Sequence, residues 1–185
     1  MDVTGVVLAA GEGARAGGPK ALRRAPDNEP WLAIACAALK DAGCREVVVV
    51  LGAEADAAAE LVPRGAIPVV ATDWHEGQSA SLKVGLAAAA TSSADAVLLT
   101  LVDLPGQTAE AGKRVIAAGA EDGREALARA HYDGEPGHPV LIGRDHWGEL
   151  GESLSGDMGA RDYLRNHLTL EVDCSDLGGG ADVDF

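Results

Sequence analysis

The stretch from Val3 to Gly13, V-T-G-V-V-L-A-A-G-E-G, joins an apolar run of strand length to a glycine-rich loop. Val3 to Ala9 predicts the first strand, and similar apolar runs alternate along the chain with longer Ala-rich segments of helical period. That alternation is typical of a parallel sheet with helices on both faces. Ligands bind beyond the carboxyl ends of the strands in open parallel sheets, so the loop after Ala9 is a candidate site.

The rest of the chain continues this alternation. Strands are predicted at residues 47–51, 69–71, 96–101, 126–132, 140–142 and 168–172, and helices at residues 31–42, 54–61, 79–90, 108–120, 145–150 and 160–166. The run at 96–101 is almost entirely apolar, as in a central strand that is buried on both faces. Thr108 is expected to cap the helix that follows Pro105. Because no long linker divides the sequence, a single α/β domain over residues 1–185 is expected.

The composition restricts the possible partners. The chain has 15 Lys and Arg against 29 Asp and Glu, a net charge of −14, and 47% of its residues are hydrophobic. That apolar fraction is too high for a disordered protein. Nucleic acids and anionic membranes are bound through spread-out Lys and Arg, so neither is an expected partner. An anionic ligand therefore needs a local basic pocket or a metal ion.

The cysteines and the N-terminus indicate a reducing compartment. Cys36, Cys44 and Cys174 are odd in number and form no C-x-x-C pair, so structural thiols are expected rather than disulfides or a zinc site. The first residues carry no basic segment before a long apolar run, and no stretch reaches the roughly 18 apolar residues of a membrane span. A cytoplasmic protein is expected.

The loop from Gly11 to Lys20 is the most basic part of the chain together with the two arginines just beyond it. Small residues let backbone N–H groups approach a polyphosphate closely, and Arg15 and Lys20 supply positive charge. A plain connection between a strand and a helix is the simpler interpretation, since a lone glycine-rich loop is weak evidence. A P-loop is excluded because Pro19 precedes the lysine and Ala21 replaces the metal-binding hydroxyl.

A dinucleotide motif fits the loop poorly as well. Ala16 stands at the third glycine position, and the second strand ends only near Leu51, much later than that motif requires. The loop therefore favours a mononucleoside triphosphate.

The pattern L-A-A-G-x-G-x-R-x-G-x-x-K over Leu8 to Lys20 resembles the signature of the MobA/MocA-like nucleotidyltransferases, which load cytidine or guanosine nucleotides onto molybdopterin. The resemblance implies a single-domain, three-layer, Rossmann-like (GT-A-like) fold with a mostly parallel central sheet. It also implies that the loop wraps the nucleotide, while Arg15 and Lys20 steady its phosphates. The implied loop contacts are Leu8, Ala9, Ala10, Gly11 and Gly13. Gly13 replaces the serine that is usual in the family, and Ala10 favours CTP over GTP.

Asp103 lies just after the strand predicted at 96–101, where a carboxylate is costly without a partner or a cation. A magnesium ion shared with triphosphate oxygens would supply that cation. The alternative is a residue that caps the helix near Thr108 or turns the chain before Pro105. In the family, a D-x-P at this point provides the metal-binding carboxylate, which the resemblance assigns to Asp103.

A second carboxylate is expected to help hold the ion. Asp182 and Asp184 match the D-[IV]-D that the family carries before its last helix, and Asp184 is the first choice. The sequence ends at Phe185 without that helix, so Asp157 is the reserve candidate.

Two further segments resemble family elements. G-x-S-x-S-L-x-x-G-L begins at Gly77 and includes Ser79 and Ser81, beside the nucleotide in the family; ordinary helix capping by either serine is the alternative. The elements G-H-P and G-D-x-G-A-R are typical of the cytidylyltransferase branch and imply that His138, Asp157 and Arg161 contact the acceptor. A lone histidine is more often structural, but an arginine suits a phosphate as a bidentate partner.

Together these motifs predict a Mg²⁺-dependent enzyme that transfers CMP from CTP to molybdopterin with release of pyrophosphate. Arg15, Lys20 and Asp103 would act by positioning and charge neutralisation. Three alternatives stay open: a guanylyltransferase of the same cofactor, a cytidylyltransferase for a sugar or polyol phosphate, and a non-catalytic protein that delivers the cofactor to a molybdoenzyme client.

Overall fold

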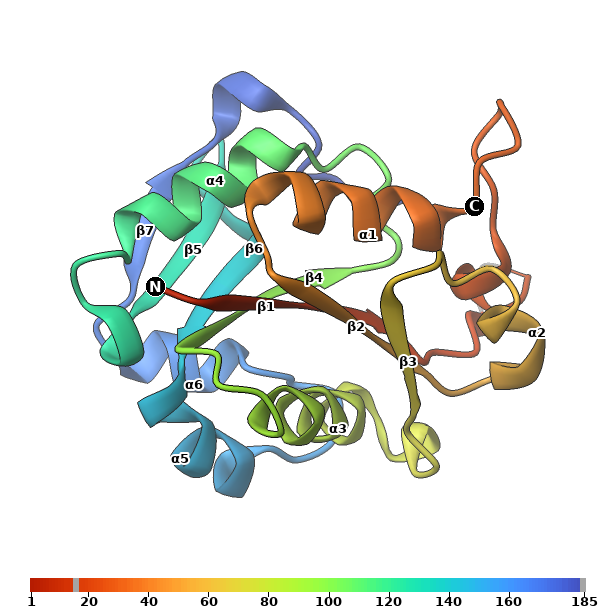
Figure 1. Ribbon diagram of the computed structural model, residues 1–185, viewed down its shortest axis with the longest axis horizontal. Helices are drawn as coiled ribbons and strands as arrows, with labels where there is room; N and C mark the ends of the chain where they lie inside the picture. Colours follow the sequence, from red (N-terminus) through yellow and green to blue (C-terminus); the bar gives the residue numbers. More distant parts are fainter. Residues whose placement is uncertain (15–16, 184–185) are drawn as a thin grey trace.

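The computed structural model describes residues 1–14 and 17–183, whose strands form one seven-stranded sheet in the order β3-β2-β1-β4-β6-β5-β7 (Figure 1). The strands are β1 (Val3–Ala9), β2 (Glu46–Leu51), β3 (Ala66–Val70), β4 (Ala96–Leu101), β5 (Leu127–Tyr132), β6 (Glu135–Gly143) and β7 (Leu170–Asp173). β6 runs antiparallel to β4 and β5, and the other pairs are parallel. The predicted α/β fold with a mostly parallel central sheet is confirmed.

Helices cover both faces of the sheet (Figure 1). α1 (Trp31–Ala42) and α4 (Ala109–Ala118) lie on one face, and α3 (Gln78–Ala90), α5 (Trp147–Ser153) and α6 (Arg161–Asn166) lie on the other. The short α2 (Ala55–Ala59) follows β2. Alternate side chains of β1 pack into two separate apolar cores. Val7 lies in the core under α1 and α4, and Val6 lies in the core under α3 and α5. This alternation explains why the central strands are apolar at nearly every position.

The elements of the sheet centre have the predicted bounds. β1, β4 and α1 agree with their predicted ranges, and Thr108 caps α4 by accepting a hydrogen bond from the backbone of Ala111. The predicted helix at 54–61 is shorter, because Glu54 takes a left-handed backbone with φ of 52° and the helix spans only Ala55–Ala59.

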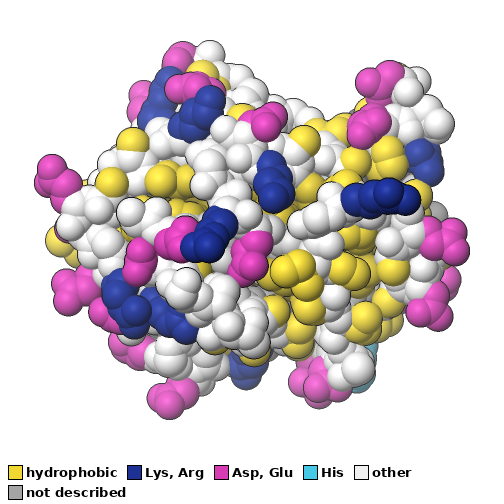
Figure 2. Space-filling model, in the orientation of Figure 1, with side chains coloured by type: hydrophobic (Ala, Val, Ile, Leu, Met, Phe, Trp, Pro, Cys, Tyr) yellow, Lys and Arg dark blue, Asp and Glu magenta, His cyan; other side chains and the backbone are white. Residues whose placement is uncertain are grey.

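The predicted bounds of two strands differ from those in the structure. β3 covers Ala66–Val70 instead of 69–71, and β6 starts at Glu135 instead of 140. In both strands a proline, Pro68 or Pro136, interrupts the apolar pattern on which the prediction depended. β3 is an edge strand, where a proline is tolerated. Its side chains Ile67 and Val70 are 44% and 53% exposed, and an apolar area covers this part of the surface (Figure 2).

The three cysteines are buried free thiols, as predicted. Burial raises the pKa of Cys36 and of Cys44 to about 12, so neither is a reactive thiolate at neutral pH. Over residues 1–14 and 17–183, no helix has both the length and the apolar character needed to cross a bilayer.

Candidate active site

The glycine-rich loop leaves β1 at the carboxyl edge of the sheet and turns tightly on itself. The N–H of Gly18 donates to the carbonyl of Gly13 over 3.2 Å, and Gly13 has a left-handed φ of 60°. A Cβ atom at residue 13 would lie 2.0 Å from the carbonyl oxygen of Gly18. Glycine is therefore required at this position, and the serine that the family usually carries there would need a different turn.

The ends of three parallel strands are tied together at this edge. Val102, after β4, donates its N–H to the carbonyl of Leu8 over 3.1 Å, and Ala53, after β2, donates to the carbonyl of Ala10 over 2.9 Å. These bonds fix the first residues of the loop on both sides, so the loop begins from a rigid base.

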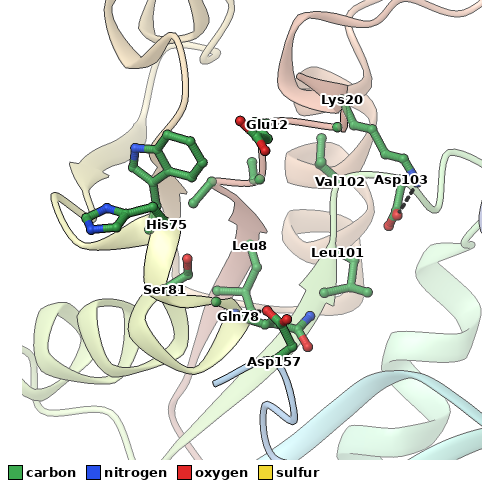
Figure 3. Close-up of a pocket in the computed structure, with 16 residues that line it drawn as sticks. Leu8, Glu12, Lys20, His75, Gln78, Ser81, Leu101, Val102, Asp103 and Asp157 are labelled. Carbon is green, nitrogen blue, oxygen red and sulfur yellow. Dashed lines mark hydrogen bonds and ion pairs between the residues drawn. The ribbon is translucent and has the colours of Figure 1, made fainter. Parts of the chain in front are cut away.

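A cavity of about 530 Å³ opens above these strand ends (Figure 3). Ten of the predicted site residues line it, namely Leu8, Ala9, Ala10, Gly11, Gly13, Lys20, Gly77, Ser81, Asp103 and Asp157. We refer to it as the first cavity. Its volume is in the range of sites for small molecules and cofactors.

Lys20 and Asp103 form an ion pair on one side of the first cavity (Figure 3). The ammonium nitrogen Nζ of Lys20 lies 2.9 Å from Oδ2 of Asp103, and each side chain is only 18% exposed. Their 83-residue separation in sequence is closed by the β1–β4 pairing. Because Thr108 rather than Asp103 caps α4, the interpretation of Asp103 as a helix cap is excluded.

The second carboxylate oxygen of Asp103 meets the requirements of a cation ligand. Among the residues that the structure describes, buried Oδ1 has no hydrogen-bond partner. No group of three or more potential ligands gathers within residues 1–14 and 17–183. Mg²⁺ commonly takes one or two carboxylates and completes its shell with phosphate oxygens and water, so a single carboxylate beside a triphosphate fits this ion.

The C-terminal segment reaches the same place. The N–H of Val183 donates to the backbone carbonyl of Asp103 over 3.0 Å, which brings the Asp182-Val183 segment beside the predicted metal ligand. The side chain of Asp182 is exposed there. Asp184 and Arg15 lie outside the described residues, so their predicted roles remain predictions.

The start of α3 differs from the arrangement expected for phosphate binding. Its first two N–H groups are not free, because Gln78 donates to Oδ1 of Asp157 over 3.3 Å and Ser79 donates to the carbonyl of Gly156 over 3.0 Å. The hydroxyl of Ser79 donates to the carbonyl of Ser155 over 3.0 Å. Ser79 thus holds the 155–157 loop, whereas Ser81 lines the first cavity.

Gly77 makes this docking possible. It has φ of 112°, and a Cβ atom there would lie 2.5 Å from Oδ1 of Asp157. Glycine is therefore the residue that lets the 155–157 loop approach the start of α3.

A second cavity of about 340 Å³ adjoins the first, and Leu8 and Gln78 line both. Two of the three predicted acceptor residues, His138 and Arg161, line this second cavity. The third, Asp157, lines the first cavity. The walls of the second cavity are mostly apolar, with contributions from Leu82, Leu99, Val140, Met158, Ala160 and Leu164.

His138 is uncharged at neutral pH. Desolvation lowers its pKa to about 4, although the nearby Asp103 carboxylate acts in the opposite direction. Its backbone carbonyl accepts a hydrogen bond of 2.9 Å from the hydroxyl of Tyr132. His138 therefore offers a neutral imidazole to the second cavity, and Arg161 provides a positive charge there.

Six residues that line the first cavity were not among the predicted site residues: Glu12, Trp74, His75, Gln78, Leu101 and Val102. Glu12 lies inside the quoted loop, Trp74, His75 and Gln78 belong to the segment around Gly77, and Leu101 and Val102 directly precede Asp103, so their position in sequence was a usable signal. Their side-chain types matched no motif of the expected chemistry.

Strand order and cavity position define the class. The cavity lies beyond the carboxyl ends of the neighbouring parallel strands β1 and β4, where the strand order reverses direction, as in nucleotide-binding proteins with a Rossmann-like sheet. The chain belongs to the family with the MobA-like NTP transferase domain, which it matches over residues 5–172.

Several known proteins are similar to the chain. It is 38% identical to nicotine blue oxidoreductase of Paenarthrobacter nicotinovorans, over 98% of this chain and 92% of that protein. Rv0371c of Mycobacterium tuberculosis has 32% identity and a TM-score of 0.83, with 100% of this chain and 93% of that chain covered. A manganese complex of Rv0371c has 29% identity and a TM-score of 0.77, with coverage of 94% and 88%.

The similarity of the fold extends further. A molybdopterin-guanine dinucleotide biosynthesis protein A from Archaeoglobus fulgidus has a TM-score of 0.69 at 16% identity, with coverage of 94% and 85%. The manganese complex of Rv0371c shows a divalent cation bound to that protein.

Proposed function

We propose that the chain transfers CMP from CTP, bound in the first cavity, to a molybdopterin-type acceptor, bound in the second. One observation carries this proposal: the Lys20–Asp103 pair, with its unpartnered carboxylate oxygen, lies in a cavity that directly adjoins another. The chemistry needs a charge-neutralising site for a triphosphate next to a site for the incoming group.

In the proposed reaction, a phosphate oxygen of the acceptor attacks the α-phosphorus of CTP. A new P–O bond forms, the bond to the β-phosphate oxygen breaks, and pyrophosphate leaves with that electron pair. No side-chain base is required, because the acceptor oxygen is already an anion. Lys20, together with Arg15, would bind the phosphates and offset their charge.

A divalent cation would be held by Asp103, with Asp184 as the proposed second ligand and Asp157 in reserve, and would stabilise negative charge on the phosphoryl oxygens. We propose Mg²⁺ as the physiological ion. Asp103 would hold the cation, and Lys20 beside it would bind phosphate oxygens.

The acceptor would bind in the second cavity. Its apolar walls suit a flat ring system, Arg161 suits a phosphate, and neutral His138 suits a hydrogen-bonding group of the ring. Leu8 and Gln78, shared by both cavities, lie where the reacting groups would meet.

The test is pyrophosphate release by the purified protein with molybdopterin and Mg²⁺, with CTP and GTP compared at equal concentration. We expect turnover with CTP, and a larger rise in melting temperature with CTP than with GTP. A preference for GTP would move the proposal to a guanylyltransferase. Release only with a sugar or polyol phosphate would replace the acceptor, and nucleotide binding without any release would favour a delivery protein.

We place this reaction in the cytoplasm, consistent with three buried free thiols. A molybdoenzyme that receives the finished cofactor is the proposed client. The net charge of −14 speaks against nucleic acid or an anionic membrane as a further partner.

A second candidate is an oxidoreductase, favoured by the 38% identity to nicotine blue oxidoreductase over almost the whole chain. In that case the first cavity would hold the nucleotide part of a reduced nicotinamide cofactor, and hydride would pass to an oxidised ring compound in the second. Oxidation of NADH or NADPH in the presence of a quinone-type dye is the measurement. Asp103→Asn separates the candidates, because it should abolish nucleotidyl transfer and leave hydride transfer within about threefold.

A further inference from the structure

Trp74 differs from the other two tryptophans of the chain in its surroundings. Trp31 and Trp147 are core residues with 5% and 8% exposure, whereas Trp74 is half-buried and lines the first cavity. It packs against the core beneath α3 with part of its surface and leaves the rest at the cavity. A large aromatic side chain thus forms part of the wall of the first cavity.

The position of the Trp74 side chain is fixed from two directions. A Cβ atom at Gly52 would lie 2.7 Å from both Cβ and Cγ of Trp74, so the chain after β2 presses directly on the base of the indole. The ring also meets the His75 ring edge to face, with centroids 6.1 Å apart and planes at 88°. Both contacts limit the rotamers that are open to Trp74.

The aromatic wall lies across the first cavity from the ion pair. Figure 3 shows His75 on one side of the cavity and Lys20 with Asp103 on the other. Trp74 adjoins His75. A nucleotide whose phosphates lie at Lys20 would therefore extend its base toward the Trp74 side. Nucleobases stack on aromatic side chains irrespective of sequence, because every base has a π-face.

We propose that the indole of Trp74 stacks on the nucleobase and determines the affinity of the first cavity for nucleosides over simple phosphates. This proposal rests on the proposed function in that the ligand of the first cavity is a nucleotide. Trp74 acts here on binding, and no bond to it forms or breaks.

The experiment measures affinities by isothermal titration calorimetry for CTP and for inorganic tripolyphosphate, each with Mg²⁺. Trp74→Leu removes the ring, Trp74→Phe keeps an aromatic face, and Thr72→Ala is the matched control because Thr72 is exposed in the same connection and does not line the cavity. Melting temperatures of all variants monitor folding. Fluorescence quenching by CTP in the parent protein provides a second readout, since the other two tryptophans are buried.

We expect Trp74→Leu to weaken CTP binding by about 5- to 100-fold and to leave tripolyphosphate binding within twofold. Trp74→Phe should keep CTP affinity within about threefold while the quenching disappears. Equal CTP affinity in Trp74→Leu and the parent, or equal losses for CTP and tripolyphosphate, would overturn the proposal. Failure of the proposed function shows differently: CTP binds with quenching, but molybdopterin brings no pyrophosphate release.

Discussion

The two adjoining cavities are built from different parts of the fold. The first lies at the carboxyl ends of parallel strands β1 and β4 and contains the Lys20–Asp103 ion pair. The second lies against antiparallel β6 and the start of α6, and its walls are mostly apolar. The first cavity thus depends on the parallel part of the sheet, while the second depends on an antiparallel strand and a short helix.

This difference separates two properties of the proposed enzyme. Changes in the first cavity should affect the chemical step and the nucleotide, and changes in the second should affect the acceptor. Ser79 and Asp157 connect the two, because they attach the 155–157 loop to the start of α3. A substitution that alters both properties equally would show that the cavities act as one site.

The largest effect is expected for Asp103→Asn. The substitution removes the charge that would hold a cation and pair with Lys20, at nearly constant volume. We expect a loss of at least about 100-fold in turnover, typical for removal of an electrostatic contact to the transition state. Pyrophosphate release measures it. Asp145→Asn is the control, since that exposed carboxylate pairs with Arg124 and lines neither cavity; a similar loss in both variants would contradict the assignment.

Arg161→Ala should act on the second cavity alone. Loss of a charged, bidentate donor to an acceptor phosphate is expected to raise the KM for the acceptor about 10- to 50-fold and to leave the KM for CTP unchanged. Arg161→Lys keeps the charge without the bidentate geometry, so its KM for the acceptor should lie between those of the parent protein and Arg161→Ala. Steady-state kinetics with each substrate varied in turn gives both constants. A rise in the KM for CTP of the same size would show that Arg161 serves the first cavity.

His138, which lines the second cavity, should make the free energy of unfolding of the protein depend on pH. Because burial lowers its pKa from 6.5 to about 4, the unfolded state binds a proton before the folded state does. Its contribution is present above pH 6.5 and is lost as the pH falls toward 4. We expect a loss of about 1 to 2 kcal/mol, less than the full shift implies because the side chain is only half-buried.

The measurement is urea denaturation of the parent and of His138→Gln at pH 7 and pH 4.5. The variant should lose less free energy of unfolding between these two pH values, since glutamine does not titrate. Equal losses in the two proteins would mean that other groups carry the dependence.

The smallest effect is expected for Ser79→Ala. It removes one buried hydrogen bond to the carbonyl of Ser155, so the free energy of unfolding should fall by about 1 kcal/mol. Thermal melting measures this loss. If the loop joins the cavities as described, the KM for the acceptor should rise more than the KM for CTP; unchanged kinetics would confine Ser79 to a stabilising role.

The sequence predicted the first cavity better than the second. Strand ends and glycine-rich turns have local signatures, and the parallel pairing of β1 with β4 brings the loop after β1 to the same edge of the sheet as Asp103. The contact between Gln78 and Asp157 spans 79 residues and follows no local pattern. β6 was underestimated because Glu135 and Pro136 break the apolar alternation at its start.

The two serines of α3 illustrate a further limit. Positions two apart on a helix lie on nearly opposite sides, so Ser79 and Ser81 were not both able to face one cavity. Periodicity alone did not indicate which serine faces the first cavity, because both side chains are buried. Ser81 lies in the wall of the first cavity, and Ser79 is bonded to the 155–157 loop from a distant part of the chain. The aromatic wall at Trp74 had no signature among the expected motifs.

Pro68, at the centre of the outermost strand β3, has a consequence for the behaviour of the protein at high concentration. The free side of an edge strand is a template on which another molecule adds a strand, and the exposed Ile67 and Val70 would favour such growth. A residue without an N–H in the middle of a five-residue strand limits the ladder that an added strand can build. Pro68 thereby hinders edge-to-edge aggregation along the exposed apolar strand β3.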